Sequence, residues 1–216
     1  MRRRAEILAE MGIAPVWRLR TFSKDIAEEK PVPAWIPLKA AVSGCTRCAL
    51  HQARTQTVFG VGDENADWML IGEAPGAEED RLGDPFVGQA GKLLDNMLAA
   101  VGLSRRENVY IANVLKCRPP GNRNPSPDEV EKCSPHLLQQ IALIQPKLIV
   151  AMGRFAAQTL LKTDASISSL RGRLHSYAGV PLIVTYHPAY LLRTLEDKAK
   201  AWEDLVFARK TMAGLA

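Results

Sequence analysis

Four short apolar runs, each followed by a stretch with helical spacing, are the feature that most constrains how this 216-residue chain folds. The apolar runs are residues 68–71, 109–112, 147–152 and 182–185, and the helical stretches are residues 91–101, the segment from Pro127 onward, 154–161 and 196–210. Apolar strands that alternate with helices are typical of a parallel sheet covered on both faces. The sequence therefore predicts an α/β fold, a three-layer α/β/α sandwich whose central, mainly parallel sheet has about four strands.

The first 40 residues differ from the rest of the chain. Residues 2–11 have helical spacing and begin with three arginines, and a stretch rich in charge and proline follows. Pro31, Pro33 and Pro37 exclude a helix there and favour an extended arm. The sequence thus predicts an N-terminal extension over residues 1–40 and one domain over residues 41–216. A solvated tail explains the arginines better than a DNA-binding arm.

Composition and charge exclude several classes of protein. No apolar run approaches the ~18 residues that cross a bilayer, which excludes a membrane-spanning chain. The basic N-terminus lacks the apolar segment of a secretory signal, so we expect an intracellular, cytoplasmic protein in a reducing compartment. The net charge of +5 is compatible with a polyanionic partner.

The unusual residues follow the predicted strands. In an open parallel sheet, ligands bind beyond the carboxyl ends of the strands, so these residues predict one crevice built from several loops. They are Gly72-Glu73-Ala74-Pro75-Gly76, Asn113, Gly153 and His187-Pro188. Taken singly, each also fits a structural role as a tight turn, a helix cap or a satisfied side chain. Neither glycine-rich phosphate-binding pattern is present, so a dinucleotide or nucleoside triphosphate site lacks support.

The four cysteines have the spacing of metal ligands. Cys45 and Cys48 form a CxxC pair, and Cys117 and Cys133 supply a second pair through folding. Four thiolates suit either Zn²⁺ or an iron–sulfur cluster, and the spacing does not decide between them. A thioredoxin-like redox pair is disfavoured because this CxxC does not open a helix after a strand.

Basic and apolar side chains beside the predicted crevice are candidates for DNA contact. The cations are Lys116, Arg118 and Arg123 near a Pro-Pro-Gly turn, together with Arg193 after the histidine loop. They could hold a phosphate backbone or be ordinary surface charge. Beside His187, an apolar wedge for a displaced base could come from Tyr190, Leu191 and Leu192, or these residues simply begin the last helix.

Longer strings carry a resemblance to a known family. In order along residues 41–193, they are Cys45-x-x-Cys48, GEAPGAEED from Gly72, DPFVGQAGKLLDNML from Asp84, NVLKCRPPGNRNP from Asn113, Cys133 and HPAYLLR from His187. Together these strings resemble the family 4 iron–sulfur uracil-DNA glycosylases. The resemblance implies an α/β/α sandwich and hydrolytic removal of uracil from DNA, which leaves an abasic site and free uracil.

The resemblance also implies a cofactor, partners and a substrate. It favours a structural [4Fe–4S] cluster, with zinc as the alternative, on the set Cys45, Cys48, Cys117 and Cys133. The substrate would be uracil-containing DNA, single- or double-stranded, bound by a monomer that does not interact with membranes.

Roles for individual residues follow by position in the matching strings. Glu73, Ala74 and Pro75 would line the uracil pocket, and Phe86 would stack on the base. Asn113 would read the edge of uracil, and His187 would face its carbonyl side. His187 and Glu73 would be the catalytic residues, Glu73 either as a general base or, as we prefer, as a group that orients water and counters the sugar cation. A related branch that traps uracil covalently carries an inserted basic loop with a histidine, which residues 114–133 lack.

Two other classes of function stay open at this point. One is a non-catalytic iron–sulfur module that binds DNA and holds a base without cleaving it, which an activity assay distinguishes. The other is a zinc-stabilised hydrolase of small nucleotides, for which we expect a colourless protein that does not depend on polymeric DNA.

Overall fold

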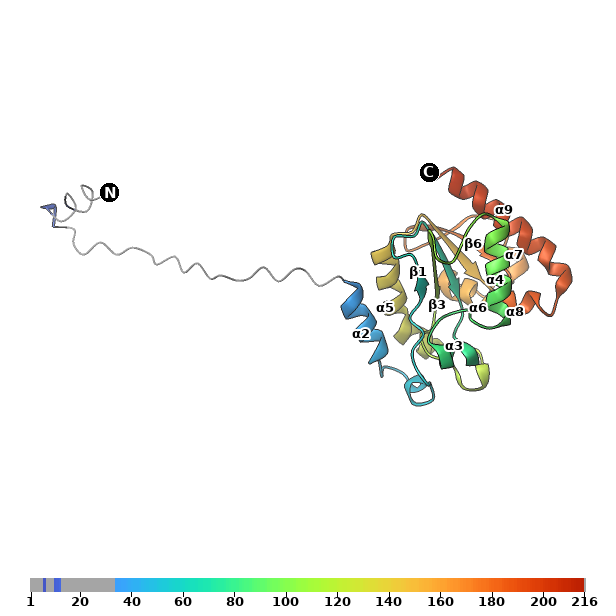
Figure 1. The fold of residues 1–216 in the computed structure, drawn as a ribbon, viewed down its shortest axis with the longest axis horizontal. Helices are drawn as coiled ribbons and strands as arrows, with labels where there is room; N and C mark the ends of the chain where they lie inside the picture. Colours follow the sequence, from blue (N-terminus) through green and yellow to red (C-terminus); the bar gives the residue numbers. More distant parts are fainter. Residues whose placement is uncertain (1–5, 7–9, 13–33, 216) are drawn as a thin grey trace. The chain divides into compact units, whose positions relative to one another are not determined.

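The computed structural model describes residues 6, 10–12 and 34–215 (Figure 1). Most of the predicted first helix, the three arginines and the predicted extended stretch up to residue 33 lie outside the described residues. The described residues from 34 onward belong to one compact unit.

A six-stranded sheet forms the centre of this unit. Its strand order is β1-β3-β2-β4-β6-β5. The four inner strands are parallel and match the predicted runs: β2 (Trp68–Gly72), β3 (Val109–Asn113), β4 (Leu148–Met152) and β6 (Val180–Thr185). The predicted fold class is confirmed. The two further strands, β1 (Val61–Gly62) and β5 (His175–Tyr177), pair antiparallel at the edges and are too short to produce an apolar run.

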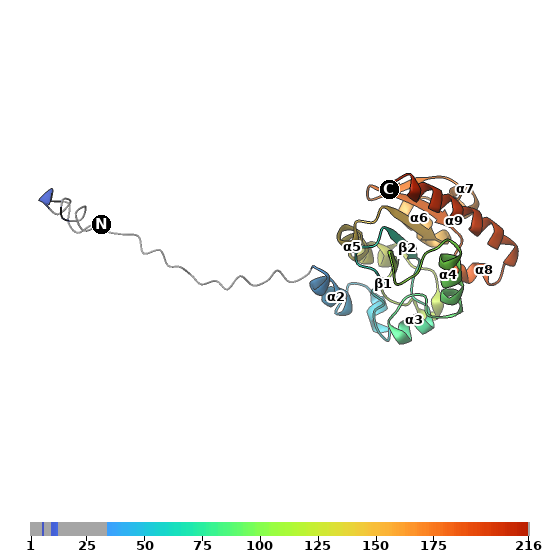
Figure 2. The same ribbon diagram turned by 45° about the horizontal axis from the view of Figure 1, so that its top comes forward.

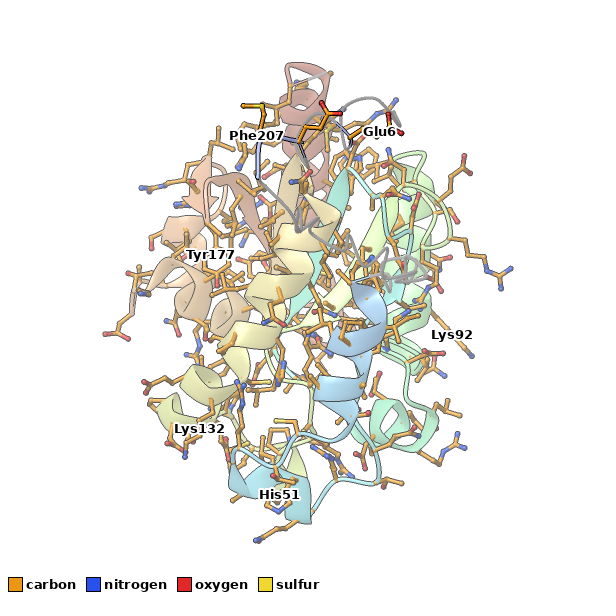
Figure 3. All side chains as sticks on the ribbon, turned by 90° about the vertical axis from the view of Figure 1, so that its left-hand side faces the viewer. Glu6, His51, Lys92, Lys132, Tyr177 and Phe207 are labelled. Atoms are coloured by element: carbon orange, nitrogen blue, oxygen red, sulfur yellow. The ribbon has the colours of Figure 1, made fainter. Side chains whose placement is uncertain are left out.

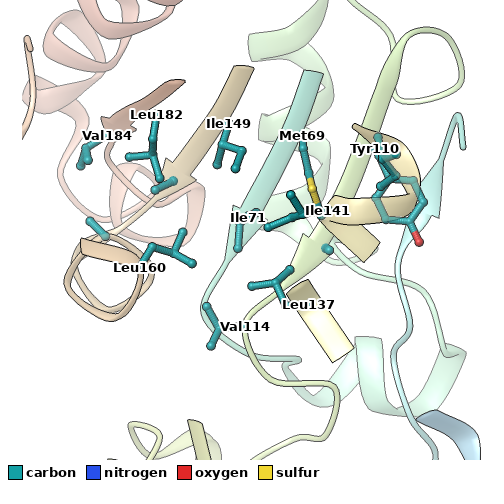
Figure 4. Close-up of a cluster of buried hydrophobic side chains, with 14 of the residues drawn as sticks. Met69, Ile71, Tyr110, Val114, Leu137, Ile141, Ile149, Leu160, Leu182 and Val184 are labelled. Atoms are coloured by element: carbon teal, nitrogen blue, oxygen red, sulfur yellow. The ribbon is translucent and has the colours of Figure 1, made fainter. Parts of the chain in front are cut away.

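Helices cover both faces of the sheet, so the sheet and the two helical layers form a three-layer sandwich (Figures 1 and 2). On one face, strand residues such as Met69 and Ile71 pack against α5 (Pro127–Ile144), α6 (Arg154–Leu161) and α7 (Ile167–Leu170), as Figure 4 shows. On the other face, Leu70 and its neighbours pack against α4 (Gln89–Ala100) and α9 (Lys198–Ala213). Since successive strand residues point to opposite faces and both faces are buried, the four inner strands are almost continuously apolar, and the polar residues Asn113 and Thr185 stand only at their carboxyl ends.

Shorter helices lie in the connections. They are η1 (Ala49–Gln52), α3 (Ala77–Leu82), η2 (Pro120–Asn122), α8 (Pro188–Leu191) and η3 (Leu195–Asp197). The predicted start of α5 is confirmed, because the Ser126 side chain accepts a hydrogen bond from the Glu129 backbone and Pro127 occupies the first turn. Residues 190–192 do not begin the last helix, since α8 and η3 precede α9.

The prediction that Pro37 excludes a helix is wrong. Helix α2 (Trp35–Ser43) contains Pro37 in its first turn, where backbone N–H groups have no partner within the helix and their loss costs little. The ring of Trp35 packs against Phe59 and Tyr110, with ring centroids 5.8 and 5.7 Å apart. The predicted division at residue 40 therefore falls inside a helix that packs on the body of the protein.

Candidate functional site

The carboxyl ends of β2 and β3 bring Gly72 and Asn113 side by side. The two residues are register partners in the parallel ladder. A Cβ atom on Gly72 would lie 2.4 Å from Asn113 Oδ1 and 2.8 Å from Phe86 Cζ, so only glycine leaves room for both side chains. Asn113 is 3% exposed, and its Oδ1 atom has no hydrogen-bond partner among the residues described. This buried carbonyl oxygen is therefore free to accept a hydrogen bond from a ligand.

Phe86 packs beside the carboxyl ends of β2 and β3, close to Gly72. It lies in the loop before α4, is 5% exposed and stacks on the His187 ring, with centroids 5.4 Å apart and planes 30° apart. Its backbone has a φ of 55°, which is unusual for a bulky residue. The loop therefore holds the Phe86 ring against His187 in a conformation that neighbouring residues must maintain.

His187 stands two residues beyond β6 and caps helix α8. Its Nδ1 accepts a hydrogen bond of 3.1 Å from the Ala189 backbone N–H. Burial, reinforced by the charge of Arg193, lowers the pKa of His187 to about 4. The ring is thus neutral near pH 7, and because Nδ1 is an acceptor, the proton resides on Nε2. His187 can offer one N–H donor to a ligand without carrying a charge.

Gly153 leaves room for the His187 side chain because it has no Cβ atom. It follows β4 with a φ of 93°, and a Cβ atom there would lie 2.8 Å from His187 Cβ. The predicted convergence of Gly72, Asn113, Gly153 and the His187 loop at one edge of the sheet is therefore present.

Glu73, Ala74 and Pro75 continue from β2. Glu73 is half-buried; burial raises its pKa to about 7, although the charge of Arg154 lowers it. Pro75 is buried, while Ala74 packs against the cluster that contains Cys117 and Cys133. The sequence interpretation did not single out Arg154. The signal that could have found it is its position directly after Gly153, the glycine that follows β4.

The four cysteines line one cavity. Cys117 and Cys133 are buried, Cys45 and Cys48 are half-buried, and all four are free thiols. Arg54 Nη1 donates to Cys117 Sγ at 3.0 Å, and the Lys116 backbone N–H donates to Cys133 Sγ at 3.3 Å. Hydrogen bonds of this kind stabilise sulfur ligands that carry negative charge.

Positive side chains surround this cysteine cavity. Arg47, Arg54 and Lys132 line it together with His51 and His136, and Figure 3 shows His51 and Lys132 at the same end of the molecule. In the described ranges, no three His, Cys, Asp or Glu side chains are grouped as ligands of a single metal ion. The donor set and its charged surroundings fit an anionic centre held by four thiolates.

Two of the side chains predicted to contact DNA, Lys116 and Leu191, are buried in this structure. Lys116 is 1% exposed, and its Nζ donates to the Asn113 carbonyl at 2.8 Å and to Gln140 Oε1 at 2.6 Å. Leu191 is also 1% exposed. Both side chains point into the protein, so neither reaches DNA in this structure. A turn sequence indicates where the backbone lies and does not indicate which way a side chain points.

The other predicted contacts lie at the surface or near it. Arg118 is half-buried and donates to Asn122 Oδ1 at 2.7 Å. Arg123 is exposed and forms a two-bond ion pair with Glu129. Arg193 is exposed, and Leu192, next to the buried Leu191, is 42% exposed. Among the helices described, none is both long and apolar enough to cross a membrane.

Comparison with known proteins gives consistent matches. Residues 59–206 match the family model of the uracil DNA glycosylase superfamily. A type-4 uracil-DNA glycosylase of Archaeoglobus fulgidus is 49% identical over 159 residues, covering 70% of this chain and 79% of that protein. One from Thermotoga maritima is 45% identical and covers 74% and 83%, and one from Pyrobaculum aerophilum is 41% identical and covers 78% and 89%.

Proposed function

Since the chain belongs to the type-4 uracil-DNA glycosylases of the uracil DNA glycosylase superfamily, we propose that it removes uracil from DNA at the crevice between β2, β3 and β6. The reaction is hydrolysis of the bond between C1′ of deoxyribose and N1 of uracil. Its products are free uracil and an abasic site in the DNA. A uracil inside a duplex must first be flipped out, at a cost of a few kcal/mol.

The unpaired Oδ1 of Asn113 is the observation that carries this proposal. In uracil, N3–H is a donor and O4 an acceptor, so Oδ1 accepts from N3–H while Nδ2 donates to O4. Cytosine presents the reverse pattern, which would leave a buried amide unsatisfied. That penalty is the source of selectivity. In this arrangement Phe86 stacks on the flipped base, and Ala74 and Pro75 contribute to the pocket wall.

His187 and Glu73 stabilise the two charges that develop as the bond breaks, one on the uracil ring and one on the sugar. As the C1′–N1 bond breaks, its electron pair moves to the uracil ring. The His187 Nε2–H donates to O2, where negative charge develops. Glu73 orients the attacking water and counters the positive charge of the sugar. The water oxygen bonds to C1′, and its proton leaves to solvent or to the uracil anion.

The rate of excision is expected to rise with pH through about 7, the pKa of Glu73. Glu73 orients water and balances the sugar cation only as a carboxylate, which predominates above that pKa. Single-turnover rates between pH 5.5 and 9 would follow this rise, and the Glu73→Gln variant should be slower and lack it. A rate that falls over this range would show that the protonated acid is the active form.

The reaction itself is tested with an oligonucleotide that contains one uracil, incubated with freshly purified protein and cleaved with alkali at abasic sites. Matched oligonucleotides with thymine or cytosine are the controls. Cleavage only with uracil supports the proposal. A folded protein that retains its cluster, binds this DNA and leaves the uracil in place would instead be a binding module.

We propose that Cys45, Cys48, Cys117 and Cys133 hold a [4Fe–4S] cluster. Support comes from the single cavity that they line, the N–H donors to Cys117 and Cys133 and the surrounding cations. The cluster stabilises the fold around the crevice when bound and takes no part in bond cleavage. Measured iron and sulfide, or zinc in their place, distinguish the two centres.

The Cys117→Ser variant is expected to lower stability more than chemistry. Loss of one ligand should bleach the protein and lower the melting temperature by about 5–10 °C, because a domain of this size loses roughly 2–4 °C per kcal/mol. Visible absorbance and thermal unfolding measure this, and Thr46→Ala, at an exposed position between Cys45 and Cys48, is the control. A stable, colourless and fully active Cys117→Ser protein would contradict the structural role.

We propose that Arg118, Arg123 and Arg193 contact the DNA backbone. Arg193 follows the His187 loop, and Arg118 directly follows Cys117 in the chain, so both are candidates to contact phosphates near the flipped base, together with Arg123. We assign the protein as a monomer on DNA, and uracil excision from single- and double-stranded oligonucleotides defines its strand preference.

A further inference from the structure

Phe86 needs a partner that holds its backbone in place. A φ of 55° is a costly conformation for a residue with a bulky side chain, and it persists only where contacts enforce it. On one side, a Cβ atom on Gly91 would lie 1.7 Å from the Phe86 carbonyl oxygen, so the first turn of α4 presses directly on this oxygen. A donor on the other side would fix the loop.

Arg105 supplies that donor. Its Nη2 donates to the Phe86 carbonyl at 3.0 Å, and its Nη1 donates to the Pro85 carbonyl at 3.4 Å. Its Nε donates to Asp95 Oδ1 on α4 at 2.5 Å, and Nη2 also reaches the Gly91 carbonyl at 3.5 Å. The side chain is 20% exposed. One guanidinium thus joins the loop before β3, the Phe86 loop and helix α4.

The chemistry of the guanidinium suits this task. Its planar, fixed set of N–H donors can serve two successive carbonyls and a carboxylate at once, whereas the ammonium group of lysine lacks that geometry. The loop that Arg105 holds carries the ring that touches both Gly72 and His187.

We propose that Arg105 is a positioning residue for uracil, which acts by holding Phe86 in its left-handed conformation against the crevice. This inference rests on the proposed function, because it concerns the ring that would stack on the flipped base. Arg105 itself touches neither the base nor the sugar in this assignment.

Arg106 provides a matched control. It is exposed, it lines the same surface hollow as Arg105, and its side chain makes no hydrogen bond within the part of the chain that is described. Arg105→Ala and Arg106→Ala each remove one positive charge from the same loop. Any general effect of charge on DNA affinity is therefore common to both variants.

The test compares kcat/KM for a single-uracil oligonucleotide. Arg105→Ala is expected to lower it by about 10- to 100-fold, since small displacements of a positioning group have effects of this size. Arg106→Ala should stay within about twofold of the wild type, as expected for a surface side chain without contacts. Arg105→Lys keeps the charge and most of the stem, and should remain impaired. Melting temperature and cluster absorbance confirm that the variants are folded, and Arg105→Lys decides the matter if Arg105→Ala does not fold.

A double-mutant cycle with Phe86→Ala separates positioning from a general structural effect. If Arg105 acts through the Phe86 ring, Arg105→Ala should change kcat/KM by less than about threefold once that ring is absent. An equal loss in both backgrounds would overturn the inference, as would an Arg105→Ala or Arg105→Lys protein as active as Arg106→Ala. A wild-type protein that does not excise uracil would instead overturn the proposed function, and the role of Arg105 with it.

Discussion

The His187→Ala variant is expected to excise uracil about 10²- to 10³-fold more slowly than the wild type, the usual cost of removing one donor to developing negative charge. The neutral ring offers only its Nε2–H, since Nδ1 is occupied by the Ala189 N–H. Alanine removes this donor and leaves the uracil anion without stabilisation at O2. Single-turnover rates at saturating enzyme measure the change directly.

Two comparisons make the His187 result specific. His175→Ala, on the edge strand β5, removes a histidine outside the crevice and should excise uracil at the wild-type rate once its folding is verified. With 5-fluorouracil, whose anion is more stable, His187→Ala should lose less activity, because less charge needs stabilisation. An equal loss with both bases would assign His187 to the pocket rather than to the leaving group.

The Asn113→Ala variant is expected to lower kcat/KM for uracil by about 10²- to 10³-fold, because two hydrogen bonds to the base are lost in a buried site. Both bonds are made to the bound base before cleavage as well as during it, so a rise in KM should accompany any fall in kcat. Steady-state kinetics on the single-uracil oligonucleotide measure both.

Free uracil provides an independent readout for Asn113. It should inhibit the wild type and not Asn113→Ala, whereas free cytosine should inhibit neither. Asn65→Ala is the matched control, since this exposed residue precedes β2 at the opposite end of the strand from the crevice. Inhibition of Asn113→Ala by uracil at wild-type concentrations would show that another group reads the base.

The sequence predicted the layers and the location of the crevice because both depend on local patterns. Strands such as β2 and β4 are buried on both faces and consist of continuous apolar runs, which are visible without any knowledge of the fold. Once those strands are parallel, Gly72, Asn113 and Gly153 must meet at one edge of the sheet. The edge strands β1 and β5 were missed because two or three residues carry no periodicity.

The sequence did not predict whether individual side chains point into the protein or toward solvent. Lys116 and Leu191 occur in strings that contain surface residues, yet both are 1% exposed. Lys116 is satisfied by Asn113 and Gln140, and Gln140 lies 24 positions further along the chain. Whether a cation is solvated or buried depends on such distant partners, and no local pattern encodes them.

The sequence by itself thus determined the fold class and the four inner strands, and it predicted the cysteine set, since each depends on residue type and spacing. Only the tertiary structure decided that Asn113 Oδ1 is buried without a partner, that the His187 proton resides on Nε2 and that Arg105 holds Phe86. These features arise from contacts between segments far apart in the chain. Their energies depend on burial and on distances of a few tenths of an ångström, which exist only after the chain has folded.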